Sequence, residues 1–271
     1  MALYSNTLAV VRAYLSTAVG DLIYGQAGTT GATTTKIYAP FLWQPNDYYN
    51  EGGYEAYVYA GTNIGVTKRV TDWDLGSFLL TVHSAYDAAC DATSYVELHH
   101  IFTEDDYRKA INLSIEHLAG KYLVNIIDDT TITLSADTYE YALPTSMLYL
   151  TKVTTEYEVA GDIFYDFDVI DSRDWSIIKA YPPILKLRKG YYSITAGKDL
   201  RLQGQGTQPT VDDDTDVIYL PLSWLIQKAI TFLPQNKIQS NELDATYRQA
   251  LVVSAREPRV YPNPRAQRIV E

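Results

Sequence analysis

The chain has 271 residues, of which 20% are charged and 46% hydrophobic, values that are ordinary for a folded protein of one or two domains. Its formal net charge of −11 excludes general nucleic-acid binding, which needs a basic surface, but does not prevent DNA from passing nearby. The sequence has no apolar stretch of about 18 residues, so we expect no membrane span. We also expect no secretory signal and, with Cys90 as the single cysteine, no intrachain disulfide.

The first segment, residues 1–26, predicts a helix. Ser5 is a suitable N-cap, and the apolar residues that follow recur at spacings of three or four. They are Leu8, Val11, Leu15, Val19 and Leu22. The run 28–36 is rich in glycine and threonine, lacks the Gly-Lys-Ser/Thr ending of a phosphate loop, and is expected to be a flexible loop.

Residues 27–102 predict a β-rich insertion. Short runs with β-branched and aromatic residues, bounded by Gly, Asn, Asp and Pro, favour strands at 36–39, 54–59 and 77–82. Cys90 within this block is expected to be a small buried hydrophobe.

Residues 103–128 predict a central helix. Thr103 can cap it, and three acidic residues follow in the first turn, where the helix dipole favours negative charge. One apolar stripe consists of Tyr107, Ile111, Ile115, Leu118 and Tyr122.

Residues 129–210 predict a second β-rich region, with strands at 131–134, 138–142, 148–159 and 191–195. The stretch 161–171 contains Asp162, Asp166, Asp168 and Asp171. Paired carboxylates can act as acid and base, but their alternation with Phe, Tyr and Val favours a strand with one solvated face.

Residues 211–256 predict an acidic loop followed by a helical hairpin. The loop contains Asp212, Asp213, Asp214 and Asp216. It lacks the glycine and glutamate that an EF-hand needs, because Val217 and Ser223 occupy those positions, so we expect a solvated loop that faces a channel or an interface edge. Two apolar helical patterns, 221–233 and the stretch after Ser240, are joined by a short connection that favours antiparallel packing.

Residues 257–271 predict an extended C-terminal arm, because Pro258, Pro262 and Pro264 prevent a helix. A frayed terminus is one interpretation, and docking onto a neighbouring molecule is the other. In the second interpretation the guanidinium groups of the arm bind carboxylates of the partner, and its apolar tip fills a pocket there. The residues expected to bind the partner are Arg256, Arg259, Tyr261, Arg265, Arg268, Ile269 and Val270. The 24 tyrosines favour either interfaces or strands.

Together these elements predict an α+β fold. We expect a helical bundle with a C-terminal helical hairpin, two inserted antiparallel β blocks that form a small sandwich or barrel, and the extended arm. The four histidines have no metal-ligand spacing, and neither a nucleophile elbow nor a dinucleotide fingerprint occurs. We therefore expect no enzymatic activity, no cofactor and no bound metal.

Three segments, 102–116, 132–144 and 219–229, together with the arm, resemble the neck proteins of tailed bacteriophages, the head-to-tail adaptors that join the portal to the tail. The resemblance covers residues 100–271. It implies a structural virion protein in the phage neck, assembled in the host cytoplasm as a homo-oligomeric, dodecameric ring. It also implies contacts with the portal protein and with tail or other neck proteins, and a channel for genomic DNA without sequence-specific binding.

Two alternatives remain open at the level of sequence. The first is another tail component, such as a tail terminator or tube subunit, which would be dominated by a sheet. The second is a carbohydrate-binding or hydrolytic β protein, suggested by a group of aromatic residues that could stack on sugars. They are Trp43, Tyr48, Tyr49, Tyr54 and Trp73.

Overall fold

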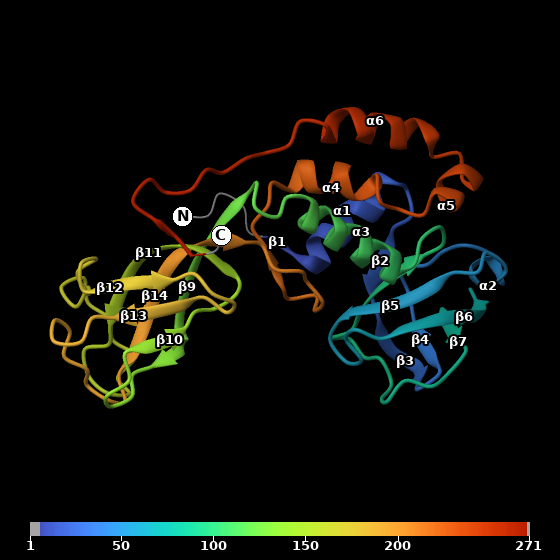
Figure 1. The fold of residues 1–271 in the computed structure, drawn as a ribbon. Helices are drawn as coiled ribbons and strands as arrows, with labels where there is room; N and C mark the ends of the chain where they lie inside the picture. The colour runs from blue at the N-terminus through green and yellow to red at the C-terminus, as the bar shows by residue number, and fades with distance from the viewer. Residues whose placement is uncertain (1–5, 270–271) are drawn as a thin grey trace. The chain divides into compact units, whose positions relative to one another are not determined.

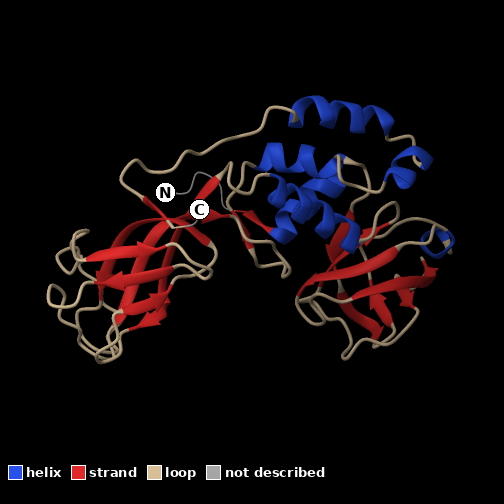
Figure 2. Cartoon of the chain, in the orientation of Figure 1, coloured by secondary structure: helices blue, strands red, loops and turns tan. Residues whose placement is uncertain are grey.

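A computed structural model describes residues 6–269, which divide into two compact units (Figures 1 and 2). The first unit contains the residues up to His117 together with Thr210–Glu257, and the second contains Leu118–Pro209 and the residues from Pro258 onward. Each unit has its own sheets and its own hydrophobic core. The expected helical bundle with small β inserts is therefore wrong. Sheets build the hydrophobic cores of both units, and the helices pack beside the sheet of the first unit.

The sheet of the first unit closes on itself. Its seven strands follow the order β2-β8-β5-β6-β7-β4-β3, so β2 and β3 lie at opposite ends of that order. Only Ala27 separates β2 from β3 in the chain, and one residue spans about 3.8 Å. β2 and β3 are therefore consecutive parts of one chain segment, which pairs with β8 through β2 and with β4 through β3 and closes the sheet into a barrel. The strands are β2 (Ile23–Gln26), β3 (Gly28–Thr33), β4 (Lys36–Tyr38), β5 (Glu55–Ala60), β6 (Thr67–Asp74), β7 (Leu79–Val82) and β8 (Tyr95–His99).

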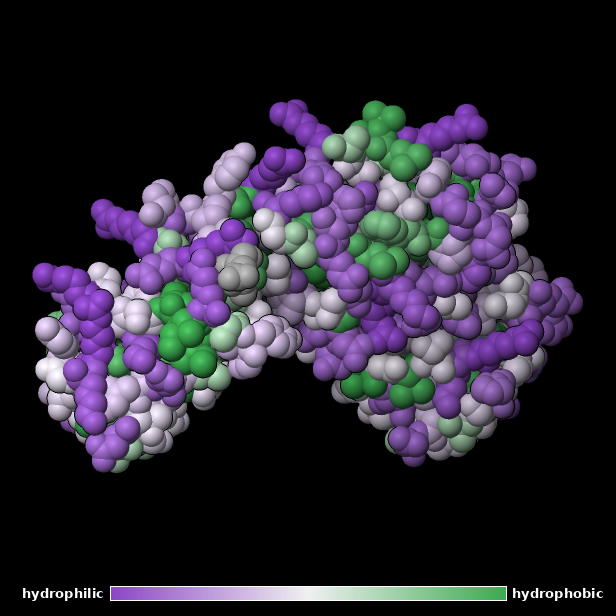
Figure 3. All heavy atoms as spheres, viewed as in Figure 1, coloured by the Kyte–Doolittle hydropathy of each residue, from purple (hydrophilic) through white to green (hydrophobic). Residues whose placement is uncertain are grey.

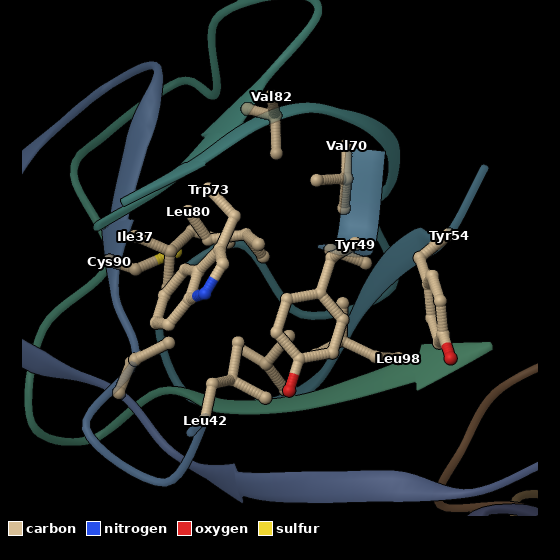
Figure 4. Packing of buried hydrophobic residues seen from close by; sticks show 14 of the residues in the cluster. Ile37, Leu42, Tyr49, Tyr54, Val70, Trp73, Leu80, Val82, Cys90 and Leu98 are labelled. Carbon is tan, nitrogen blue, oxygen red and sulfur yellow. The ribbon is translucent and has the colours of Figure 1, made fainter. Parts of the chain in front are cut away.

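The run 28–36 is thus not a flexible loop but the hairpin β3–β4, with Thr33 paired to Lys36. The interior of the barrel is apolar and is filled by inward-pointing residues of the strands together with residues of the connecting segments (Figure 4). Trp73 and Tyr49 meet edge to face at its centre, with ring centroids 5.4 Å apart. Cys90 is buried in the same core, as expected, and burial raises the pKa of its thiol.

Helices belong to the same unit. They are α1 (Leu8–Ala18), α2 (Tyr48–Glu51), α3 (Glu104–His117), α4 (Leu222–Ile230), α5 (Gln235–Ser240) and α6 (Asp244–Ser254). α2 packs on β6 of the barrel, and the others form a separate layer (Figure 1). α1, α3 and α4 pack on one another, and α6 packs on α4, where Trp224 Nε1 donates to the carbonyl of Ser254 at 3.1 Å. The short strand β1 (Asn6–Thr7) pairs with β15 (Val217–Ile218).

The helix starts follow from local capping. Thr7 caps α1 through its side chain, whereas Ser5, the expected cap, lies outside the described residues. At α3, Thr103 Oγ1 accepts the amide hydrogen of Asp106 and Asp106 Oδ2 accepts that of Thr103, a reciprocal capping box. The expected helix over 103–128 is too long: α3 ends at His117, Gly120 follows with φ of 75°, and a strand begins at Leu123.

The second unit is a two-layer β sandwich. One sheet has the order β16-β11-β14-β9 and the other β10-β13-β12, and one apolar cluster contains residues of both. The strands are β9 (Leu123–Thr133), β10 (Glu140–Ala142), β11 (Met147–Thr155), β12 (Trp175–Ile178), β13 (Ile184–Leu187), β14 (Asp199–Thr207) and β16 (Gln267–Arg268). Two expected strands are wrong, because 161–171 and 191–195 form loops.

The C-terminal arm is extended, as expected, but its end joins the sandwich of its own chain. β16 pairs with β11, the amide of Ile269 donates to the carbonyl of Leu148 at 2.9 Å, and the Ile269 side chain is 0% exposed within the core. The expectation that Ile269 fills a pocket of another molecule is therefore corrected, because burial in its own sandwich already removes its apolar surface from water. Val270 lies outside the described residues.

Candidate functional site

The barrel and the helices of the first unit meet through a buried polar layer. On β8, Val96 and Leu98 point into the barrel, so the alternate residues Glu97 and His99 point out of it toward the helices. On β5, Ala56 and Val58 point inward, and Tyr57 therefore joins the outward set. Burying ionisable groups at such a junction is costly unless each finds a partner.

Arg12 of α1 is the centre of this layer and is fully buried. Its Nε donates to Glu97 Oε2 at 2.9 Å, and its two terminal nitrogens donate to the carboxylate of Asp214. Glu104 Oε1 lies 3.6 Å from Arg12 Nη1, and the guanidinium carbon lies 4.3 Å from the centroid of the Tyr57 ring. One guanidinium of α1 thus contacts two barrel strands, α3 and the loop before β15.

Two of the carboxylates around Arg12, those of Glu97 and Glu104, have opposite pKa shifts. Burial by itself raises the pKa of Glu97, but hydrogen bonds and charges of His99 and Arg12 outweigh burial, so the pKa is lowered. Burial also raises the pKa of Glu104, and there Arg12 and Arg108 offset it only in part. The difference agrees with the geometry, because Glu97 accepts direct hydrogen bonds whereas Glu104 is held at 3.6 Å.

The acidic loop is only partly the solvated loop that we expected. Asp214 is buried against Arg12 and also accepts a hydrogen bond from the Tyr57 hydroxyl at 2.8 Å. Asp216 Oδ2 accepts the amide hydrogens of Asp212 and Asp213, which closes the loop on itself. Asp212 pairs with Arg108, and Asp213 is exposed. Asp214 therefore pairs with Arg12 inside the unit. The exposed residues of the loop, Asp212 and Asp213, line a cavity of about 430 Å³.

A second cavity of about 420 Å³ opens on the outer side of α1. Its walls are small and apolar residues of α1 together with tyrosines of three elements, and Glu97 lies among the residues that line it. The tyrosines are Tyr14 of α1, Tyr24 of β2 and Tyr59 of β5. We call this cavity the tyrosine groove.

The arm residues expected to bind a partner, as far as they belong to residues 6–269, lie along an extended segment. The side chains of Arg256, Arg259, Arg265 and Arg268 are exposed, and Tyr261 is 77% exposed. Of the aromatic residues considered for sugar stacking, Tyr49, Tyr54 and Trp73 are buried in the barrel core, whereas Trp43 and Tyr48 are exposed. Those five rings therefore do not form one exposed platform.

Within residues 6–269, no group of three or more His, Cys, Asp or Glu side chains is placed to hold a metal ion. In the same part of the chain, every helix is too short or too polar to cross a membrane. Comparison with protein-family models and with curated proteins gives no match.

Sequence reasoning missed the buried polar layer. Two signals in the sequence point toward it. Arg12 lies on the apolar stripe of α1, four residues after Leu8, and Glu97 and His99 alternate with Val96 and Leu98 in a strand. A charged residue on an apolar stripe requires a buried partner, but the partner's identity depends on contacts between residues far apart in the chain.

Proposed function

We propose that this chain is a structural subunit of a tailed-phage neck, a head-to-tail adaptor that forms a ring between portal and tail in the virion. The segments that resemble such adaptors correspond to α3, to the end of β9 with β10, and to α4. α3 and α4 pack on each other in the first unit, whereas β9 and β10 are edge strands of the two sheets of the second unit. The proposal includes a channel for DNA and no catalytic step.

The observation that carries the proposal is the outer face of α6. Its buried residues are Ala250 and Ser254, while three consecutive aliphatic residues, Leu251, Val252 and Val253, are 45%, 77% and 48% exposed. Hydrophobic residues gather over α6 in the space-filling view (Figure 3). Contiguous apolar surface of this kind marks contacts with other molecules. We define Leu251–Val253 as the α6 patch.

A ring requires two different surfaces on each subunit, since a head-to-tail contact joins unlike patches. The α6 patch supplies one of them in this proposal. The exposed arm residues Arg256, Arg259, Tyr261 and Arg265 supply contacts to a neighbouring subunit or to the portal. In this version of the arm hypothesis Ile269 anchors the arm to its own sandwich and the residues before it face the partner.

The direct test is the mass of the purified full chain, alone and mixed with a portal ring, by native mass spectrometry. We expect a ring, or a ring on mixing with the portal, and we expect Val252→Asp to abolish it. Ala245→Asp is the matched control, because Ala245 is exposed on the same helix outside the patch. A monomer under all conditions, or equal assembly of both variants, overturns the proposal.

A tail-tube or terminator subunit is the second candidate, favoured by the dominance of sheets in both units. The packing of α4 against α6 argues for the adaptor, because a tube subunit lacks a terminal helical pair. Electron microscopy distinguishes the two: stacked rings that grow into tubes without portal favour the tube subunit, and single rings on portals favour the adaptor.

A further inference from the structure

The tyrosine groove combines an apolar lining with aromatic rings. Ala9, Val10 and Ala13 of α1 contribute small apolar walls, and Tyr14, Tyr24 and Tyr59 contribute rings from three elements. Tyr14 and Tyr24 are 54% and 64% exposed, so both rings are accessible to another molecule. Rings that surround a cavity attract a cation to their faces, and apolar walls cover the methylene stem of a long side chain.

Glu97 gives the groove a charge at its base. The residue is 2% exposed and lines the groove. Both hydrogen bonds that its carboxylate accepts, from Arg12 and from His99, end on Oε2. Among residues 6–269, no hydrogen bond to Oε1 is made. A guanidinium that enters the groove can donate to this oxygen in a charge-assisted hydrogen bond.

The charges around Glu97 are also unequal. Three buried carboxylates, those of Glu97, Glu104 and Asp214, share one fully buried guanidinium, that of Arg12. Arg108 lies on the far side of Glu104, toward Asp212. The region next to the groove is therefore short of positive charge, which makes it complementary to a cation.

The same unit already contains the arrangement that such a cation would form. Arg12 places its guanidinium 4.3 Å from the centroid of Tyr57 while it donates to Glu97. Arginine suits both contacts at once, because its planar and weakly hydrated guanidinium stacks on rings and forms directed hydrogen bonds to carboxylates. The tyrosine groove offers the same two kinds of contact, aromatic rings and a carboxylate oxygen, to a guanidinium of another molecule.

We propose that the tyrosine groove is a receptor for an arginine side chain presented by a partner protein. The guanidinium stacks between the rings of Tyr14, Tyr24 and Tyr59 and donates to Oε1 of Glu97. The site thereby recognises one arginine residue in a segment of the partner protein. It does not depend on ring formation or on the phage assignment.

The test titrates the full chain with N-acetylarginine amide and follows the tyrosine ring signals by NMR. We expect saturable shifts of Tyr14, Tyr24 and Tyr59 with a dissociation constant of about 1 mM, typical of a ligand of this size. N-acetylcitrulline amide, which has nearly the same shape without the charge, is expected to bind at least about tenfold more weakly.

Variants separate the groove from unspecific binding. Tyr24→Ala removes an exposed ring and is expected to weaken binding about threefold to tenfold, whereas Tyr191→Ala, an exposed tyrosine of the second unit, leaves it unchanged. Glu97→Gln is expected to remove the preference for arginine over citrulline, and Tyr24→Ala remains decisive if that variant does not fold. Absence of saturable shifts, equal binding of citrulline, or no effect of Tyr24→Ala overturns the inference.

Discussion

Arg12 and Glu97 are 85 residues apart in the chain, yet Nε of the first lies 2.9 Å from Oε2 of the second. One residue belongs to the first helix and the other to a strand of the barrel. Their ion pair links α1 to the outer face of the barrel. Removing two charges from water offsets much of their mutual attraction, so such a pair adds little net stability, whereas loss of one partner leaves a buried charge and is costly.

Replacing Arg12 by methionine should be strongly destabilising. The substitution keeps the long apolar stem but leaves Glu97 and Asp214 buried without their cation, and breaking a buried pair in this way costs about 3–5 kcal/mol. Urea unfolding followed by tryptophan fluorescence measures the change. Arg248→Met, at an exposed position of α6 in the same unit, should change stability by less than about 0.5 kcal/mol. A similar change in the free energy of unfolding for both variants would contradict the buried pairing of Arg12 with Glu97 and Asp214.

Several elements of the fold could be predicted because their signals are local. The Thr103 capping box and the acidic first turn locate the start of α3, and apolar periodicity indicates α1, α4 and α6. The helix expected over residues 1–26 is too long, because α1 ends at Ala18 and β2 begins at Ile23. The end of α3 could not be predicted, because Leu118 and Tyr122 continue the helical spacing although Gly120 adopts positive φ. Apolar spacing alone does not show where the backbone changes direction.

The class of the fold could not be predicted for a different reason. Closure of the barrel depends on β2 and β3 meeting through Ala27, and Val70 and Trp73 both point inward only because a bulge lies between Val70 and Asp72. Both features depend on strand pairing between distant segments. The same holds for the site, since nothing near Asp214 in sequence indicates that its partner is Arg12.

Glu97 and Glu104 should have opposite effects on stability as the pH changes. The folded pKa of Glu97 is below its unfolded value of about 4.3. Its contribution is present above that value and is lost as the pH falls through the folded pKa. Glu97→Gln should therefore cost about 1.5–3 kcal/mol near neutral pH and much less in acid.

Glu104→Gln should show the reverse dependence. The folded pKa of Glu104 is raised, so its ionised form is disfavoured in the fold near neutral pH, and this cost disappears as the pH falls through the folded pKa. The variant should gain stability relative to the natural chain near neutral pH and lose that advantage in acid. Urea midpoints measured across the pH range check both variants, and parallel curves would contradict the assignment of opposite shifts.

The start of α3 should depend on the Thr103 hydroxyl. Thr103 Oγ1 lies 3.1 Å from the Asp106 nitrogen, so Thr103→Ala leaves that amide without its cap and should cost about 0.5–2 kcal/mol. Thr103→Ser keeps the oxygen and should recover most of the loss. Amide hydrogen exchange in the first turn of α3 gives a local readout, and equal protection in the two variants would mean that Asp106 alone holds the turn.

The end of the arm should stabilise the second unit of its own chain. Ile269 is buried among the residues of the sandwich core, so Ile269→Ala should cost about 2–5 kcal/mol, the range for truncating a buried isoleucine. Hydrogen exchange in β11 measures the effect locally, since β16 pairs with that strand. Tyr261→Ala, on the exposed part of the arm, should leave hydrogen exchange in β11 unchanged.

The two variants separate the anchoring of the arm from its proposed contacts with a partner. If Ile269→Ala speeds exchange but leaves partner binding unchanged, Ile269 anchors the arm and the partner contacts belong to Arg259, Tyr261 and Arg265. Unchanged exchange after Ile269→Ala would contradict the intramolecular anchor and return Ile269 to the residues available for a partner.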